Sequence, residues 1–447
     1  MKRLRNDLSQ PILSFAIVAD THVGAEAPNT VPPLENRRTK YVFRQLAAQK
    51  PAFVLHLGDI VHPVPALDGY GAAAVEAERL HELLRCPLHA TPGNHDIGDK
   101  ASPWMPAKSV HQDWIDMHRQ RFGAVYRAFT EADCRFILIC SPILGSGLPE
   151  EARQREWLEQ ELADNAGARL FLATHYPPYL LKPDEPDNYD NIGRRERKWL
   201  LGLVERYNVE ALFVGHIHNF LFNRHGGTRC YALPSVSFVR RDYAELFRVA
   251  PGDREEFGRN DQGRLGFFLV DVFDSGHIVH PISTDGATND ESLDPVRRTP
   301  GRHPSKVSRT ALGVHSRHSW NEVLELPYNA PTDEFQRRSV RNDYPLLALW
   351  QTGVAHLRVP ISDFSTPESA LRLAALHAAG QRFTVFTAGV PCDRHAVALR
   401  RHAKLIDSWE VVLPWAQIKA NVVAVNPQKP RPRRTTTQKN QGSTRDT

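Results

Sequence analysis

Five short apolar runs, each of strand length, end in turns that carry Asp, Asn or His side chains. Between the first three runs, apolar residues recur at near-helical spacing at residues 35–50, and residues 71–84 are rich in Ala, Glu and Leu. Because strand, helix, strand is the order of a parallel crossover unit, the pattern predicts a mostly parallel sheet. The runs and their turn residues are 15–19 with Asp20 and His22, 53–57 with Asp59, 87–91 with Asn94 and His95, 170–174 with His175, and 211–214 with His216 and His218.

The turn residues form a candidate metal site. The carboxyl ends of parallel strands share one edge of a sheet, where ligands bind, so side chains distant in sequence should converge there. Carboxylate, imidazole and amide groups without a thiolate suit Zn, Mn or Fe. Seven such ligands fit two divalent metal ions better than one, the arrangement used for in-line displacement at phosphorus. The seven are Asp20, His22, Asp59, Asn94, His175, His216 and His218.

Beyond residue 215 the pattern changes. Residues 228–238, 265–272 and 277–282 are typical of strands with little helix between them, which predicts a second, more antiparallel sheet packed on the first. Residues 291–308 have no periodicity and are interpreted as a linker. An α/β rhythm then restarts, with helices expected at 343–352, 367–379 and 393–407 and strands at 356–360, 382–387 and 409–413.

Composition limits the class of protein. Among 447 residues, 41% hydrophobic and 24% charged are typical of a globular protein, and no apolar run reaches the roughly 18 residues that span a bilayer. The five cysteines are scattered, which argues against a disulfide framework or a zinc–thiolate site. The apolar run at 12–19 leads straight into Asp20 without a cleavage site, so it is interpreted as a strand and a cytoplasmic location is expected.

The net charge of +5 is confined to the C-terminal tail. Residues 426–447 carry six basic residues and one acidic residue, which accounts for the whole excess, and this polar tail is expected to be disordered. The body of the chain is neutral, which argues against nucleic acid as a partner without excluding it.

The ordered set D-x-H, G-D, G-N-H-D, H and G-H-x-H resembles that of the calcineurin-like metallophosphoesterases, and most of all the bacterial class III cyclic nucleotide phosphodiesterases. All five blocks are present in order from Asp20 to His218. The resemblance implies a four-layer α/β/β/α sandwich at residues 1–290, followed by the linker, an additional smaller α/β domain at 309–425 and the tail at 426–447. The role of the smaller domain is left open between dimerisation and covering of the cleft.

The resemblance also implies roles for single residues. Asp59 bridges the two metals and His95 assists the leaving oxygen, while Asp96 orients His95 through a hydrogen bond. The first metal is implied to bind Asp20, His22 and His218, and the second Asn94, His175 and His216.

The expected function is that of a dinuclear metal-dependent phosphodiesterase acting on a small-molecule phosphoester, such as a cyclic or other nucleotide, by attack of a metal-bridging hydroxide. Three alternatives stay open: a nuclease, a phosphomonoesterase, and a non-catalytic scaffold. A homodimer is considered and no membrane partner is expected. Two further histidines are interpreted as structural, His56 as a core residue and His62 as a loop residue, with a position lining the cleft as the alternative for His62. Tyr176 and Tyr179 are considered as substrate contacts.

Overall fold

The structure is a computed structural model, which describes residues 10–103, 105–240, 262–288, 312–316, 320–321, 323–325 and 339–415. The expected linker and the basic tail lie outside these residues. The chain divides into two compact units. The first comprises Met1–Arg309 with Trp320–Gly353, and the second comprises Thr310–Ser319 with Val354–Thr447. No helix among the described residues combines the length and apolar character needed to cross a membrane.

Two sheets form the centre of the first unit. One sheet has the order β11-β10-β1-β2-β3, with β1, β2 and β3 parallel and β10 antiparallel to β1. The other has the order β4-β5-β6-β7-β9-β8. The strands are β1 (Leu13–Val18), β2 (Val54–His56), β3 (Leu88–Ala90), β4 (Arg127–Glu131), β5 (Cys134–Leu138), β6 (Arg169–Thr174), β7 (Ala211–Val214), β8 (Leu221–His225), β9 (Thr228–Ala232), β10 (Gly266–Phe273) and β11 (Gly276–Ser283).

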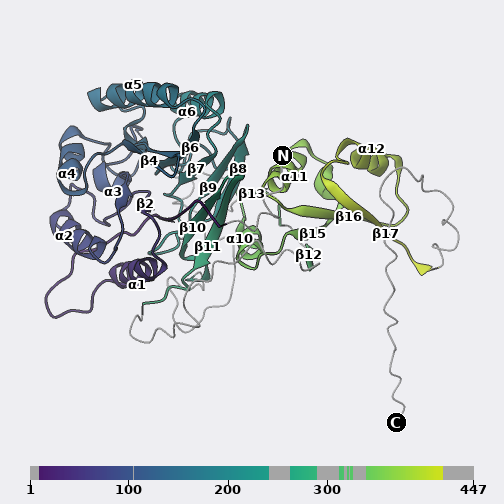
Figure 1. The fold of residues 1–447 in the computed structure, drawn as a ribbon, viewed down its shortest axis with the longest axis horizontal. Coiled ribbons are helices and arrows are strands. Elements are labelled where there is room, and N and C mark those ends of the chain that lie inside the picture. Colours follow the sequence, from purple (N-terminus) through teal and green to yellow (C-terminus); the bar gives the residue numbers. More distant parts are fainter. Residues whose placement is uncertain are drawn as a thin grey trace, which may run out of the picture. The chain divides into compact units, whose positions relative to one another are not determined.

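Helices cover the outer face of each sheet, so the first unit has the expected four layers (Figure 1). Apolar residues of α1 and α2 pack on the first sheet, and those of α5 and α6 pack on the second. The helices are α1 (Leu34–Gln49), α2 (Tyr70–His81), α3 (Asn94–Ile97), α4 (Gln112–Phe122), α5 (Pro149–Asp164) and α6 (Arg194–Arg206), with 3-10 turns η2 (Ser141–Ile143) and η3 (Gln262–Arg264).

An aromatic core fills the space between the two sheets. Phe15 on β1 lies 5.0 Å from the neighbouring Phe53 and 5.1 Å from Phe136 on β5, measured between ring centroids. Phe136 in turn stacks on Phe171 of β6. Because alternate side chains of a strand point to opposite faces, the residues between these rings, such as Leu170 and Leu172, face the helices instead. Burial on both faces explains why these strands are continuous apolar runs.

The expected sheet membership is wrong in one respect. The strands that carry the candidate ligands do not share one sheet: β1, β2 and β3 belong to the first, and β6 and β7 to the second. The hairpin β10–β11, expected in a separate antiparallel sheet, instead extends the first sheet by pairing with β1. Both sheets are apolar on both faces, so the apolar pattern alone does not distinguish which strands are neighbours.

Part of the segment expected in the C-terminal domain belongs to the first unit. Strands β13 (Val323–Glu325) and β14 (Ser339–Arg341) pair with each other, and α10 (Tyr344–Gln351) follows. Asp343 accepts a hydrogen bond from the backbone N–H of Phe222, and Arg341 donates to the Phe222 carbonyl. Trp350 packs on the Phe222 ring, 5.2 Å between centroids. These contacts join residues 339–351 to β8.

The described residues of the second unit form a small parallel sheet with the helices α11 and α12. Its strand order is β12-β15-β16-β17, and the helices α11 and α12 match two of the expected ones, although α12 ends at Arg401 where the prediction extends to 407. The elements are β12 (Gly313–His315), β15 (His356–Pro360), η5 (Ile361–Phe364), α11 (Pro367–Ala378), β16 (Arg382–Ala388), α12 (Asp393–Arg401) and β17 (Ile406–Val412).

Candidate metal centre

The candidate ligands lie on loops held together by backbone hydrogen bonds that continue beyond the strand ends. The N–H of Asp20 donates to the carbonyl of Gly58 at 3.0 Å, and the N–H of His22 donates to the carbonyl of Asp59 at 2.9 Å. Across the sheets, the N–H of His216 donates to the Asp20 carboxylate at 3.1 Å. The loops of both sheets therefore form one hydrogen-bonded unit.

Five of the ligand positions have a left-handed backbone. Such φ values are uncommon for residues other than glycine and cluster at functional sites. Within each D-x-H or H-x-H segment, the residue between the two ligands has a negative φ, so the backbone changes direction at each of the two ligands. The positions are Asp20 (57°), His22 (45°), Asp59 (52°), His216 (70°) and His218 (52°).

Two glycines allow the loops after β2 and β3 to touch. A Cβ at Gly93 would lie 2.2 Å from the Asp59 Oδ1 and 2.7 Å from the His175 Cε1. A Cβ at Gly58, whose φ is +92°, would lie 2.4 Å from the Gly93 nitrogen. Any larger residue at Gly93 would displace a candidate ligand, so the close approach needs glycine there.

The first group of ligand atoms comes from Asp20, His22, Asp59 and His218, all buried and all within 4.8 Å of one another. The Nε2 atoms of His22 and His218 are 3.0 Å apart. His22 Nε2 is 3.5 Å from the Asp59 Oδ2, and His218 Nε2 is 3.5 Å from the Asp20 Oδ1. Two imidazoles and two carboxylates thus face one point.

The second group comprises Asp59, His175 and His216, with Asn94 beside it. His175 Nε2 lies 3.4 Å from the Asp59 Oδ1, 3.0 Å from the Asn94 Oδ1 and 3.2 Å from the His216 Nδ1. Asp59 is the residue common to both groups, with Oδ2 toward the first and Oδ1 toward the second. A shared carboxylate is the arrangement that a bridging ligand requires.

Hydrogen bonds on the outer ring nitrogens prepare two histidines to bind cations. His175 Nδ1 lies 2.7 Å from the Leu57 carbonyl, and His218 Nδ1 lies 2.8 Å from the Phe238 carbonyl. Because a carbonyl only accepts, each Nδ1 carries a proton and donates it, which leaves Nε2 as the ring nitrogen that can bind a metal. Both Nε2 atoms face the ligand groups, so these residues fit metal ions.

The electrostatics of the ligand groups also favour a cation. Burial lowers the pKa of His22 and of His216 well below the ordinary value, so both rings are neutral. Burial acts the same way on His175, but the charge of Asp59 outweighs it and raises the His175 pKa to about 9. The centre thus holds a proton between His175 and Asp59, which a bound metal would displace.

The expectation that Asp96 orients His95 through a hydrogen bond is wrong, because each of the two side chains has other partners. Asp96 is the third residue of α3, and its carboxylate accepts from the backbone N–H groups of Gly93, Ile60 and Val61. His95 Nδ1 instead donates to the carbonyl of His62. The carboxylate turns back because it satisfies unpaired N–H groups at the helix start, as in a capping box. Asp96 therefore fixes the loop that carries Asp59.

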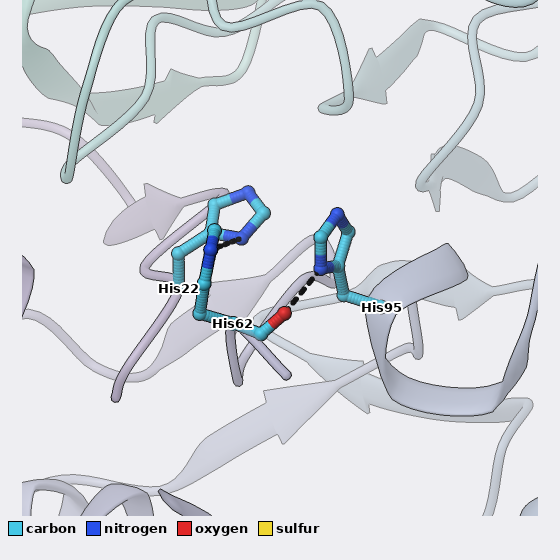
Figure 2. A group of neighbouring side chains, drawn as sticks. All are labelled: His22, His62 and His95. Carbon is cyan, nitrogen blue, oxygen red and sulfur yellow. Dashed lines mark hydrogen bonds between the residues drawn. The ribbon is translucent and has the colours of Figure 1, made fainter. Parts of the chain in front are cut away.

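His62, interpreted from sequence as a loop residue, lies at the ligand groups (Figure 2). Its Nδ1 is 3.4 Å from the Nδ1 of His22, and its ring stacks on that of His95 with centroids 5.5 Å apart. The spacing Asp59-x-x-His62 was the only available signal, and a single loop histidine is too common to identify a site. His56 is the expected core histidine, with the Thr21 hydroxyl 2.9 Å from its Nε2.

The loop before α6 adds a carboxylate that sequence reasoning missed. Asp190 is buried, with its Oδ1 3.7 Å from the His216 Nε2, and it pairs with Arg240. That Nε2 is buried without a hydrogen bond to any described residue. Tyr176 also contacts His216, ring centroids 4.3 Å apart, and is fully buried beside it rather than presented as a substrate contact.

Comparisons with known proteins agree with this geometry. Residues 13–220 match the model of the calcineurin-like phosphoesterase family. The chain is 29% identical over 189 residues to the serine/threonine-protein phosphatase CPPED1 of Danio rerio, which is 40% of this chain and 57% of that protein. It is 24% identical over 284 residues to the tartrate-resistant acid phosphatase type 5 of Oryctolagus cuniculus, which is 58% of this chain and 83% of that protein.

Among solved structures, the purple acid phosphatase PPD1 of yellow lupin (Lupinus luteus) is similar, with a TM-score of 0.41 and 18% identity over 62% of this chain and 52% of that one. The chain spans about half the length of the CPPED1 relatives it matches. The bacterial class III phosphodiesterases remain a resemblance of motifs alone.

Proposed function

We propose that this chain, whose residues 13–220 match the model of the calcineurin-like phosphoesterase family, is a metal-dependent hydrolase of phosphoesters. The observation that carries the proposal is the position of Asp59, whose two oxygens face two separate groups of imidazole, carboxylate and amide ligands. Two divalent cations in these groups would lower the pKa of a water molecule and offset negative charge on the phosphorus oxygens.

We propose that the ligands form two sets, one on each side of the Asp59 carboxylate. Asp20, His22 and His218 hold one cation, and His175, His216 and Asn94 hold the other, with Asp59 between them. Mn, Fe and Zn all fit ligands of this type, because the donors are nitrogen and oxygen without sulfur.

His95 is the residue we propose as the proton donor to the leaving oxygen. Its Nδ1 is occupied by the His62 carbonyl, so the Nε2 is the ring atom left to exchange a proton with substrate. Its ring lies 4.6 Å from the His22 ring between centroids and is partly exposed, in contrast to the buried ligands. Such a group reaches substrate without binding metal.

The substrate we propose is a small-molecule phosphoester, with a diester such as a cyclic nucleotide as the first candidate. A phosphomonoester is the second candidate, which the relatives favour because they are named as phosphatases. A nuclease is the third, against which the neutral charge of residues 1–425 argues.

The test is hydrolysis of bis-p-nitrophenyl phosphate and of p-nitrophenyl phosphate by metal-stripped protein, with Mn²⁺, Fe²⁺ or Zn²⁺ restored. Asp59→Asn, purified in parallel, is the control for contaminating activity. Metal-dependent turnover of the diester supports a phosphodiesterase, and preference for the monoester supports a phosphatase. Metal binding without turnover of either ester contradicts the hydrolase proposal and favours a scaffold.

A further inference from the structure

We propose that His62 is a positioning residue that fixes the ring of His22 through its side chain and the ring of His95 through its backbone. The inference rests on the proposed function, in which His22 binds metal and His95 donates a proton. One residue thereby links a metal ligand to the group that acts on the leaving oxygen (Figure 2).

The side-chain contact selects the form of His22 that binds metal. His22 Nε2 faces His218 and Asp59, so it is the nitrogen that serves as ligand. The proton of the neutral ring must then lie on Nδ1, which is 3.4 Å from the Nδ1 of His62. His62 accepts this proton as a long hydrogen bond, in the way that outer partners fix the tautomer of ligating histidines.

The backbone contact selects the orientation of His95. The His62 carbonyl accepts from the His95 Nδ1, and the two rings stack with an interplanar angle of 27°. The carbonyl is itself fixed, because the His62 N–H donates to the Val23 carbonyl at 2.9 Å. The N–H of Val61, one residue earlier, donates to Asp96. Asp96 thus acts on His95 indirectly: it fixes the Val61 N–H, and Val61 precedes the His62 residue whose carbonyl binds His95.

The two contacts can be separated by substitution. The His62 side chain is exposed, so its replacement should not disturb folding, and the carbonyl remains whatever the side chain. His62→Ala removes the partner of His22 and keeps the carbonyl for His95. His62→Asn places an amide oxygen near the position of the lost Nδ1, where it can again accept the proton of His22.

The experiment measures the His22 tautomer and metal affinity separately from turnover. Long-range proton–nitrogen NMR of the metal-free protein reports the tautomer, and titration with Mn²⁺ reports affinity, for wild type, His62→Ala and His62→Asn. His111→Ala, at an exposed histidine that precedes α4, is the matched control. We expect His62→Ala to mix the His22 tautomers and weaken Mn²⁺ binding by about 10–100-fold. His62→Asn should restore both, and His111→Ala should resemble wild type.

The inference is overturned if His62→Ala keeps a single His22 tautomer and wild-type Mn²⁺ affinity, or if His62→Asn is as impaired as His62→Ala. Neither readout requires catalysis. A wild-type protein that hydrolyses no phosphoester therefore contradicts the proposed function, while the tautomer and affinity data still decide the role of His62.

Discussion

Replacement of His118 by leucine should stabilise the first unit, and more so in acid. His118 lies on α4, is fully buried and packs against Phe122, with ring centroids 5.2 Å apart. Neither ring nitrogen has a hydrogen-bond partner among the described residues. A buried polar group left unpaired costs roughly 1–3 kcal/mol, and leucine also has the higher helix propensity. We expect His118→Leu to raise the free energy of unfolding by about 2 kcal/mol at pH 8.

The pH dependence follows from the direction of the pKa shift. Burial, with smaller contributions from Arg127 and Arg119, lowers the pKa of His118 from 6.5 to about 3. Below pH 6.5 the unfolded chain binds a proton that the folded chain binds only near pH 3, so acid destabilises the wild type. At pH 5 this amounts to roughly 1.5 pH units at 1.36 kcal/mol each, or about 2 kcal/mol. The advantage of the leucine variant should therefore double to about 4 kcal/mol.

Urea unfolding of both proteins at pH 8 and pH 5 measures this difference. The titration of all other groups is common to both proteins and cancels. The exposed Gln120 on the same helix serves as the control, where Gln120→Ala should change stability by about 0.5 kcal/mol or less. The reasoning would be refuted if the difference in free energy of unfolding between His118→Leu and wild type were the same at pH 8 and pH 5. An imidazole that stays uncharged in the folded protein requires this difference to increase as the pH falls.

Three further predictions concern the centre and its support. Asp59→Asn or His216→Ala should remove nearly all hydrolysis and much of the bound metal, as measured by elemental analysis beside rate assays; full metal content in both would contradict the ligand assignment. His95→Ala should lower kcat by about 10²–10⁴-fold with metal content near wild type, and metal loss would show that His95 is a ligand. Arg341→Met should lower the free energy of unfolding by about 3–5 kcal/mol because it leaves Asp343 buried without its cation, which urea unfolding would detect; a loss below 1 kcal/mol would contradict this.

The sequence was sufficient to identify seven candidate ligands that meet at the centre, but it did not identify Asp190 there, and the reason given for the convergence was incomplete. The ligands were expected along the edge of a single sheet, but they follow strands of two sheets. His216 and His218, each with a left-handed backbone, lie in different ligand groups. The chemistry of the residue types was informative because Asp and His at five strand ends are rare by chance, whereas the local backbone depends on contacts across the sheets.

Contacts formed by single polar residues could not be predicted. The Asp96 carboxylate accepts from the Ile60 N–H, which lies 36 residues away in sequence. The His62 carbonyl accepts from the His95 ring, which lies 33 residues away. No periodicity accompanies such contacts. The assignment of residues 339–351 to the first unit is of the same kind, since it depends on Arg341 and Asp343 bonding to β8.

Because the ligands are divided between two sheets, the relative positions of the loops that carry them depend on the aromatic core between the sheets. Asp20, Asp59 and Asn94 follow strands of one sheet, whereas His175 and the pair after β7 follow strands of the other. The loops that carry the two sets meet directly, whereas the sheets that bear these loops are held apart by packed rings such as those of Phe15 and Phe136. A smaller residue at either position would let the sheets approach or shear. Metal affinity would then report on packing deep inside the protein, at side chains that never touch a metal.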